Sequence, residues 1–435
     1  GTTKDGGGDN LLLSLGGGFE GDRWSAVYGV EYFDRDPIYG KDRDESDERS
    51  DFPGLEQVNT RSLLYISDVY GYDWDGDGLT YEDPGEAACN PYPEFEYSLR
   101  PGRGYYCGRD STGDESIQNS RDRLSIYGNF TFEVTDDMQM FAQLLYTEGE
   151  ITSQGFRRWW GSPFPFWNTG DTGPNGDAGR VFLGEDQPAS LALFQKIYTP
   201  DETGVQSSSF EEDSLDFAVG LRGSFGDSLW DWEAYAAYSE YNSDNSQFYF
   251  KEELIDEYYL GTYIDSPFGI PRYDVPEDWH DRLYNPITPE LVDQLSGRMS
   301  NPADSSNWTL QFNFNGEFGQ LPGGAIGVAG VLEWATQEYS ISPDDRLLNK
   351  DGEGWWGRSG TGGGGERDRY AAGVEFNLPL HETFSIPLAL RYDQYDDASD
   401  VDGAATYKVG FEWRPWRQLL VRGTYGTSFR APDMH

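Results

Sequence analysis

The strongest constraint on the fold is an alternation of apolar and polar side chains that recurs along the chain. In residues 308–315 every second side chain is Trp, Leu or Phe, and the side chains between them are Thr, Gln or Asn. The same pattern recurs at 124–132, 214–222 and 406–413. A period of two places successive side chains on opposite faces of a β-strand. Each stretch therefore predicts a strand with one apolar face and one polar or small face.

These stretches form six predicted hairpins whose connections differ sharply in length. A short turn joins the strands within each hairpin, whereas most connections between hairpins are long: 34–121, 149–210, 242–305 and 340–367, against the brief 397–403. Short turns alternating with long loops are typical of outer-membrane β-barrels, whose strands cross the hydrocarbon in about 9–11 tilted residues. The predicted hairpins are 11–20/23–33, 122–133/138–148, 211–224/229–241, 306–317/326–339, 368–378/385–396 and 404–413/418–428.

The predicted fold class is all-β, an antiparallel transmembrane β-barrel with short periplasmic turns and long extracellular loops. The six hairpins give 12 strands, and the stretch TRSLLYIS at 60–67 would raise this to 14 if it hides another pair. Aromatic side chains near strand ends would form the interfacial girdles. The alternative is that they pack in the core of a β-sandwich. These aromatic residues are Trp230, Trp232, Trp308, Trp413 and Tyr425.

Composition excludes several classes of protein. The chain has 77 acidic and 32 basic side chains and a net charge of −45, so it would repel nucleic-acid phosphates. No stretch approaches the roughly 18 apolar residues of a membrane helix. Aromatic residues make up 16 % of the chain, far more than in a disordered acidic chain. Many of the carboxylates fall in the predicted loops, which leaves the apolar strand faces nearly free of charge.

Several stretches resemble TonB-dependent outer-membrane receptors. The last of them is the most specific, because it joins a turn, two strands and the tetrapeptide FRAP in one order. One departure is Trp334-Ala335, where the family usually has Tyr-Arg. The matching stretches are EYFDRDPIYGKDRD (31–44), FGQLPGGAIGVAGVLEWATQEYSISPD (318–344), LALRYDQYDD (388–397) and YKVGFEWRPWRQLLVRGTYGTSFRAPD (407–433).

The resemblance implies a barrel of about 22 strands around a plugged lumen. On this interpretation residues 1–435 are a partial barrel that contains about 12–14 of those strands. The plug domain and the C-terminal strands would be absent from it. It further implies a monomer in the outer membrane of a Gram-negative bacterium, in contact with lipid. The function implied is energy-coupled uptake of a scarce nutrient, such as an iron-siderophore, cobalamin or an oligosaccharide. The TonB–ExbB–ExbD system would supply the energy through the plug.

Two alternatives to a receptor remain open on the sequence. A passive porin-like channel would share the alternating strands, but loops this long favour a receptor. A secreted calcium-binding protein, such as a glycan-binding protein or an adhesin, would share the acidic loops. Enzyme signals are weak, because His280, His381 and His435 are isolated and neither HExxH nor GxSxG occurs. We therefore expect no catalytic residues and no required cofactor.

Two features of the 34–121 connection predict structural cross-links. Cys89 and Cys107 are the only cysteines, and an isolated pair favours one disulfide in an oxidising compartment over two unrelated thiols. The hexapeptide DWDGDG at 73–78 spaces three carboxylates two residues apart, as in loops that bind Ca²⁺. A solvated acidic loop is the alternative. The candidate calcium ligands are Asp73, Asp75, Asp77, Glu82 and Asp83.

The 149–210 connection contains the candidate ligand-binding residues. Its segment GFRRWWGSPFPFWN at 155–168 combines arginines, which pair with carboxylates, and aromatic rings, which stack on sugars or aromatic chelators. The alternative is a loop that packs its own aromatic rings over the barrel mouth. A second loop, GEGWWGRSGTGGGG at 352–365, is also aromatic and glycine-rich. The candidate ligand-binding residues are Arg157, Arg158, Trp159, Trp160, Phe164, Phe166 and Trp167.

Overall fold

The fold is described from a computed structural model of the chain. Most residues from 1 to 434 are described, and at 60–61, 63–66, 166–168 and 191 the description is of the backbone alone. The residues left out are 5, 53–59, 62, 67–82, 101–103, 156–157, 163–165, 169–190, 227, 267–268, 400, 402 and 435.

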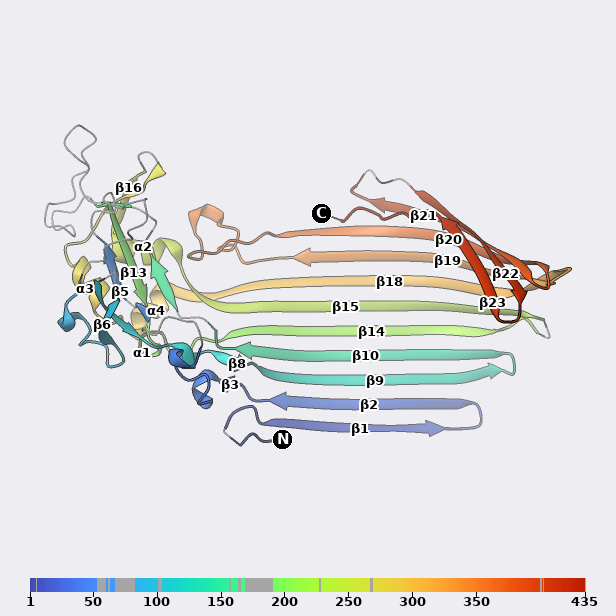
Figure 1. Ribbon diagram of the computed structural model, residues 1–435, viewed down its shortest axis with the longest axis horizontal. Coiled ribbons are helices and arrows are strands. Elements are labelled where there is room, and N and C mark those ends of the chain that lie inside the picture. Colours follow the sequence, from blue (N-terminus) through green and yellow to red (C-terminus); the bar gives the residue numbers. More distant parts are fainter. Residues whose placement is uncertain are drawn as a thin grey trace.

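One antiparallel sheet of twelve strands, here called the long sheet, dominates the molecule (Figure 1). Its strands follow chain order from β1 at one edge to β23 at the other. The strands are β1 (Asn10–Glu20), β2 (Trp24–Arg35), β9 (Ser120–Thr135), β10 (Met138–Ser153), β14 (Ser208–Ser224), β15 (Trp230–Phe250), β18 (Ser296–Leu321), β19 (Gly324–Ile341), β20 (Gly363–His381), β21 (Phe384–Asp397), β22 (Ala404–Trp416) and β23 (Leu419–Gly426).

The six predicted hairpins are all present in the long sheet, but several strands extend beyond their predicted bounds at the loop end: β15 ends at Phe250 rather than at 241, and β18 begins at Ser296 rather than at 306. Their tight turns gather at one end of the strands, and the long connections leave from the other end (Figure 1). Between β14 and β15, Gly226 has a φ of +60°, a left-handed conformation that glycine adopts without strain. The predicted arrangement of short turns opposite long loops is therefore confirmed.

The extra pair of barrel strands considered for residues 60–67 is wrong. The segment forms two short strands outside the long sheet, β4 (Thr60–Arg61) and β5 (Leu63–Ile66). They pair with β7 (Gly104–Arg109) and β13 (Leu191–Ile197), respectively. Strands of two and four residues are too short to cross a bilayer, which takes about 9–11. The long sheet therefore has the lower of the two expected strand counts.

The two faces of the long sheet differ in chemistry. The register aligns Ala236 with Leu310 and Leu310 with Trp334, so the apolar sets of neighbouring strands share one face, here called the apolar face. Many of its large side chains are exposed, as the 49 % exposure of Leu310 illustrates. The opposite face, here called the polar face, carries the residues between them, such as Gln311 and Glu333. This separation is what a barrel wall needs to face lipid on one side and a lumen on the other.

The long connections fold together beyond one end of the long sheet, and we call this region the loop cap (Figure 1). None of the described helices is long and apolar enough to span a bilayer. The helices of the loop cap are α1 (Pro200–Thr203), α2 (Glu252–Leu260), α3 (Trp279–Tyr284) and α4 (Pro289–Leu295), with 3-10 turns η1 (Gly40–Asp42), η2 (Arg49–Asp51), η4 (Glu86–Ala88), η5 (Thr112–Asp114) and η7 (Lys350–Gly352).

The remaining strands of the loop cap are short and form three small sheets. Besides β4 and β5 they are β3 (Ile38–Tyr39), β6 (Glu96–Arg100), β7 (Gly104–Arg109), β8 (Ser116–Gln118), β11 (Trp159–Gly161), β12 (Phe166–Asn168), β13 (Leu191–Ile197), β16 (Thr262–Asp265) and β17 (Arg272–Asp274). Among the described residues, the largest cluster of buried apolar side chains lies here and extends to Phe248 and Phe250 at the end of β15. It includes Trp160, Phe194, Tyr259, Leu260 and Leu283.

Candidate functional site

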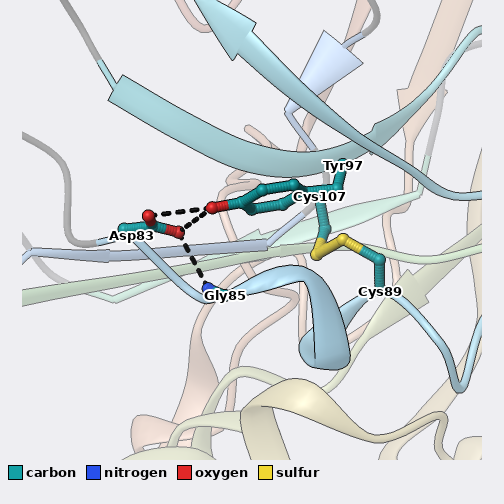
Figure 2. Close-up of a disulfide and its surroundings, with 5 residues drawn as sticks. All are labelled: Asp83, Gly85, Cys89, Tyr97 and Cys107. Atoms are coloured by element: carbon teal, nitrogen blue, oxygen red, sulfur yellow. Dashed lines mark hydrogen bonds between the residues drawn. A yellow bond between two sulfur atoms is a disulfide. The ribbon is translucent and has the colours of Figure 1, made fainter.

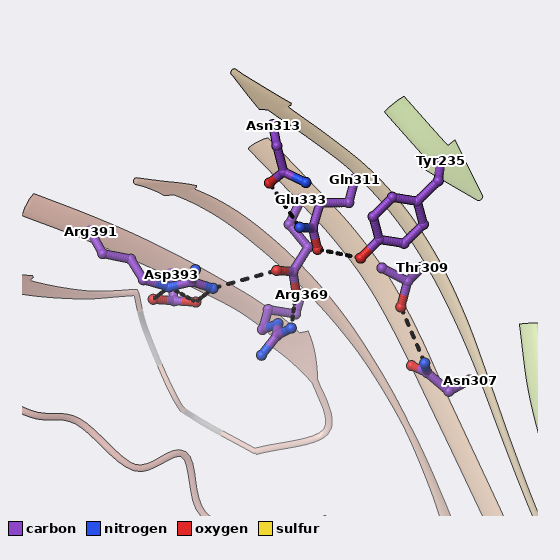
Figure 3. Close-up of polar contacts among 9 residues, drawn as sticks. All are labelled: Tyr235, Asn307, Thr309, Gln311, Asn313, Glu333, Arg369, Arg391 and Asp393. Carbon is purple, nitrogen blue, oxygen red and sulfur yellow. Dashed lines mark hydrogen bonds and ion pairs between the residues drawn. The ribbon is translucent and has the colours of Figure 1, made fainter. Parts of the chain in front are cut away.

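The first candidate site is an ionic network on the polar face of the long sheet (Figure 3). Glu333 of β19 accepts a hydrogen bond from the guanidinium of Arg369 on β20, and its other carboxylate oxygen lies 3.7 Å from Nη2 of Arg391 on β21. Arg391 also donates to both oxygens of Asp393, at 2.8 and 2.9 Å. Two cations and two carboxylates from three adjacent strands thus balance one another on this face.

Neutral polar side chains continue the ionic network toward β15 (Figure 3). The hydroxyl of Tyr235 donates to Oε1 of Gln311 at 2.9 Å, and Nε2 of Gln311 donates to Oδ1 of Asn313 at 2.9 Å. Nearby, Asn307 donates to Thr309 at 3.2 Å. We call these nine residues the polar lane. It offers donors and acceptors to a polar solute, in contrast to the apolar face behind it.

The second candidate site is the aromatic segment of the 149–210 connection, which the structure divides. Trp160 is fully buried: its indole donates to Asp256 Oδ1 at 2.7 Å and stacks on Tyr259 with 4.3 Å between the ring centroids. Burial raises the pKa of Asp256 to about 7. Trp159 is 49 % exposed. Neighbouring tryptophans therefore serve different purposes, one as an anchor and the other as a surface residue.

The other predicted ligand-binding residues are only partly described. Arg158 donates to the Gln206 carbonyl at 2.8 Å and lies over the Phe248 ring, and burial lowers the pKa of its guanidinium. Arg157 and Phe164 lie outside the described residues. Phe166 and Trp167 are placed in β12 by their backbone alone. Their assignment as ligand-binding residues stays a prediction.

The disulfide region lies within the loop cap (Figure 2). Cys89 and Cys107 are joined with a Cα–Cα distance of 5.3 Å, and the Cys107 side chain is fully buried. Close by, Asp83 accepts hydrogen bonds from the Tyr97 hydroxyl, at 2.7 and 2.8 Å, and from the Gly85 amide at 2.8 Å. The bond to Asp83 raises the pKa of Tyr97 to about 12.

The predicted calcium site cannot be placed from the described part of the chain. Asp73, Asp75, Asp77 and Glu82 lie outside it, and Asp83 is engaged by Tyr97 and Gly85. Among the described residues no group of three or more His, Cys, Asp or Glu side chains could hold a metal ion. A calcium ion bound by the DWDGDG loop therefore stays a prediction.

A buried ion pair in the loop cap was missed by the sequence reasoning. The Lys196 ammonium is fully buried and lies 3.0 Å from Glu202 Oε1. It donates to the Tyr92 hydroxyl at 2.9 Å and to the Asn285 carbonyl at 2.6 Å. Burial lowers the pKa of Lys196, and Glu202 opposes that shift. Glu202 also accepts from the Ile287 amide at 3.1 Å, so the pair ties three long connections together.

The architecture is identified by the similarity of the chain to a known protein family. The model of the family "TonB dependent receptor-like, beta-barrel" matches residues 146–435. The chain belongs to this family. Its members are outer-membrane proteins of Gram-negative bacteria, and they are transporters rather than enzymes. The resemblance noted in the sequence is thereby confirmed, as is the partial-barrel fold class.

Two solved structures are among those to which the chain is similar. A mutant of the ferric enterobactin receptor from Pseudomonas aeruginosa in complex with enterobactin is 11 % identical, with a TM-score of 0.47, and the match covers 99 % of this chain and 43 % of that one. The RagAB peptide importer is 13 % identical, with a TM-score of 0.46, and the match covers 96 % and 36 %. The chain thus spans less than half of their length. No curated protein matches it.

Proposed function

We propose that this chain is part of the barrel of a receptor that takes up a scarce nutrient across the outer membrane. The observation that carries the proposal is the family match, which covers about two-thirds of the chain. In this account the apolar face of the long sheet contacts lipid, and the polar face lines the lumen through which the nutrient passes. The loop cap lies at the extracellular end and makes the first contact with the nutrient.

The polar lane supports this assignment of the two faces. A polar solute that leaves water needs partners for its own donors and acceptors, and the lane presents amide, hydroxyl and carboxylate groups along adjacent strands. The cations of Arg369 and Arg391 are each paired with carboxylates, so the lane carries little net charge. Weak, repeated contacts of this kind allow a solute to bind and to leave again.

Energy coupling is proposed to come from TonB, ExbB and ExbD, acting through a plug domain. The complete barrel would have about 22 strands, of which the long sheet supplies twelve. We propose a monomer, because a closed barrel satisfies its own backbone hydrogen bonds in lipid. Candidate nutrients are an iron-siderophore, cobalamin and an oligosaccharide.

Growth of a receptor deletion strain on single candidate nutrients tests the proposal. The strain should lose growth on one nutrient at low concentration and regain it with the full-length gene. Growth should also be lost in a strain without a functional TonB. Growth that persists without TonB would instead indicate the passive porin-like channel.

A further inference from the structure

Two Trp-Trp pairs from different connections meet in the loop cap. One is Trp159-Trp160 in β11, and the other is Trp355-Trp356 in the connection between β19 and β20. Although almost 200 residues separate the pairs in sequence, the rings of Trp159 and Trp356 lie 4.6 Å apart at an interplanar angle of 85°. The two aromatic loops recognised in the sequence therefore form one surface.

In each pair one tryptophan anchors its loop. Trp160 is held by Asp256 and Tyr259, as described above. Trp355 is 4 % exposed, and its indole donates to the Asp344 carboxylate at 2.8 Å. A Cβ at position 297 would lie 2.9 Å from the Trp355 ring, so Gly297 leaves the space that this ring fills. The anchors fix the positions of both loops before any ligand arrives.

The other tryptophan of each pair is presented at the surface. Trp159 is 49 % exposed and Trp356 is half-buried. The Trp159 ring lies across Gly161, where an added Cβ would come within 3.1 Å of it. The Trp356 amide donates to the Phe250 carbonyl at 2.9 Å, which ties the second ring to the end of β15. A perpendicular pair on fixed backbones sets two apolar surfaces at right angles, a corner against which a flat ring can pack at low entropic cost.

The charges around this corner indicate the class of ligand. Carboxylates outnumber cations, eight to four, in the flanking residues 251–257 and 344–358. Arg346 pairs with Glu253 and Glu353 at 2.7 and 2.9 Å, whereas Arg358 has no ion pair among the described residues and donates to the Tyr249 hydroxyl at 2.6 Å. Ferric tris-catecholates are anions, and the excess of carboxylates here disfavours them. Carboxylate acceptors and an aromatic corner suit instead a neutral ligand that offers hydroxyl donors and an apolar ring face.

One carboxylate, that of Glu252, contacts the loop that carries Trp356. The Glu252 carboxylate lies against Gly354, where a Cβ would come within 2.8 Å of Oε2. Gly354 precedes Trp356 by two residues, and its carbonyl accepts from the Glu252 amide at 2.9 Å. Within the described residues Glu252 has no ion pair, unlike its neighbour Glu253. Its oxygens are therefore able to accept hydrogen bonds from a bound hydroxyl group.

We propose that Trp159 and Trp356, with Glu252 beside them, form a binding platform for a ring of a neutral oligosaccharide. The apolar face of a pyranose stacks on Trp159, its edge abuts Trp356, and a hydroxyl donates to Glu252. This inference rests on the proposed uptake function and names the nutrient class for it. The anchors Trp160 and Trp355 are positioning residues that keep the corner open.

Calorimetric titration of the purified full-length receptor in detergent tests the platform. The probes are maltohexaose, cellohexaose, laminarihexaose and xylohexaose, and the anionic comparator is a ferric tris-catecholate. We expect at least one neutral probe to bind and Trp159→Ala to weaken it about tenfold, the equivalent of one lost aromatic contact. Trp159→Phe should restore most of the affinity. Tyr263→Ala removes another exposed aromatic ring of the loop cap and should change nothing.

Three outcomes would overturn the platform: equal affinity in Trp159→Ala, binding of the ferric chelate alone, or no binding of any neutral probe. Resistance of each variant to trypsin shows that the loop cap remains folded, and Trp159→Phe provides a reading if Trp159→Ala does not fold. TonB-dependent growth on a ferric chelate that survives Trp159→Ala would refute the platform and leave the uptake function standing. Loss of TonB dependence on every nutrient would refute the uptake function itself.

Discussion

The long sheet and the loop cap both contain many aromatic residues but use them in opposite ways. On the long sheet, Leu310 and Trp308 expose about half of their surface, because the apolar face meets lipid rather than a protein core. In the loop cap, Trp160 and Phe194 are fully buried, because this region lies in water and must make its own core. The same side chains therefore report on the solvent around them, and exposure alone does not identify a functional surface.

The ion pairs of the two regions also differ in their exposure to solvent. The pairs of the polar lane, such as Arg391–Asp393, are partly exposed toward the lumen. The pair Lys196–Glu202 has no exposure and connects three loops. The lane is open to a passing solute, whereas the buried pair is open to none. This contrast leads to predictions that act on one region and spare the other.

The largest expected effect is on the loop cap. Lys196→Met would leave the Glu202 carboxylate buried and unpaired, which costs about 3–5 kcal/mol. We expect the loop cap to open, with faster amide hydrogen exchange in β13 and α1, while the long sheet stays protected. Lys350→Met removes the exposed pair with Asp345 and should have almost no effect. Equal loss of protection in both regions would show that they do not fold independently.

The next effect is confined to the long sheet. Leu310→Arg places a charge on the apolar face and should destabilise the barrel by about 2–4 kcal/mol near the bilayer centre. Gln311→Arg, one residue along β18 on the polar face, should cost far less. Unfolding of the full-length receptor by urea in liposomes measures both changes. Similar losses for the two variants would contradict the assignment of faces.

The third effect is a pH dependence of the stability of the loop cap. Burial raises the pKa of Asp256 to about 7, so the folded loop cap binds this proton more tightly than the unfolded chain does. Its contribution to stability is greatest at low pH and is lost as pH rises through 7. We expect a loss of roughly 2 kcal/mol between pH 5 and 7, and a flatter profile for Asp256→Asn. Hydrogen exchange of α2 measures the profile, and an unchanged slope in the variant would refute this assignment.

The smallest effect concerns the disulfide region. Tyr97→Phe removes the hydroxyl that donates to Asp83 and should lower local stability by about 1 kcal/mol. Tyr105→Phe is the matched control, because its ring stacks on Tyr97 and is 42 % exposed. Trypsin cleavage between residues 83 and 107 under oxidising conditions measures the difference. Faster cleavage in the control than in Tyr97→Phe would contradict the role given to the hydroxyl.

The long sheet could be predicted from the sequence because its information is local. Alternation within residues 308–315 defines the faces of β18, and within each hairpin the partner strand follows after a short turn. The loop cap could not be predicted from the sequence, because its contacts join segments that are distant along the chain. Trp160 forms a hydrogen bond with Asp256, and Lys196 forms one with Tyr92. The aromatic loop was recognised by composition, yet only the fold separates the displayed Trp159 from the buried Trp160. Neither the residues next to Lys196 in the sequence nor its charge indicated that it would be buried.

The central claim is that the long sheet is a wall between lipid and a polar lumen. Nitroxide labels at single cysteines along 308–313 of β18, in the full-length receptor reconstituted in liposomes, test it most directly. Oxygen should reach labels at Trp308, Leu310 and Phe312, and a water-soluble nickel chelate should reach those at Thr309, Gln311 and Asn313. A period of two with these opposite phases is the predicted result. Accessibility without alternation, or with the phases exchanged, would contradict it.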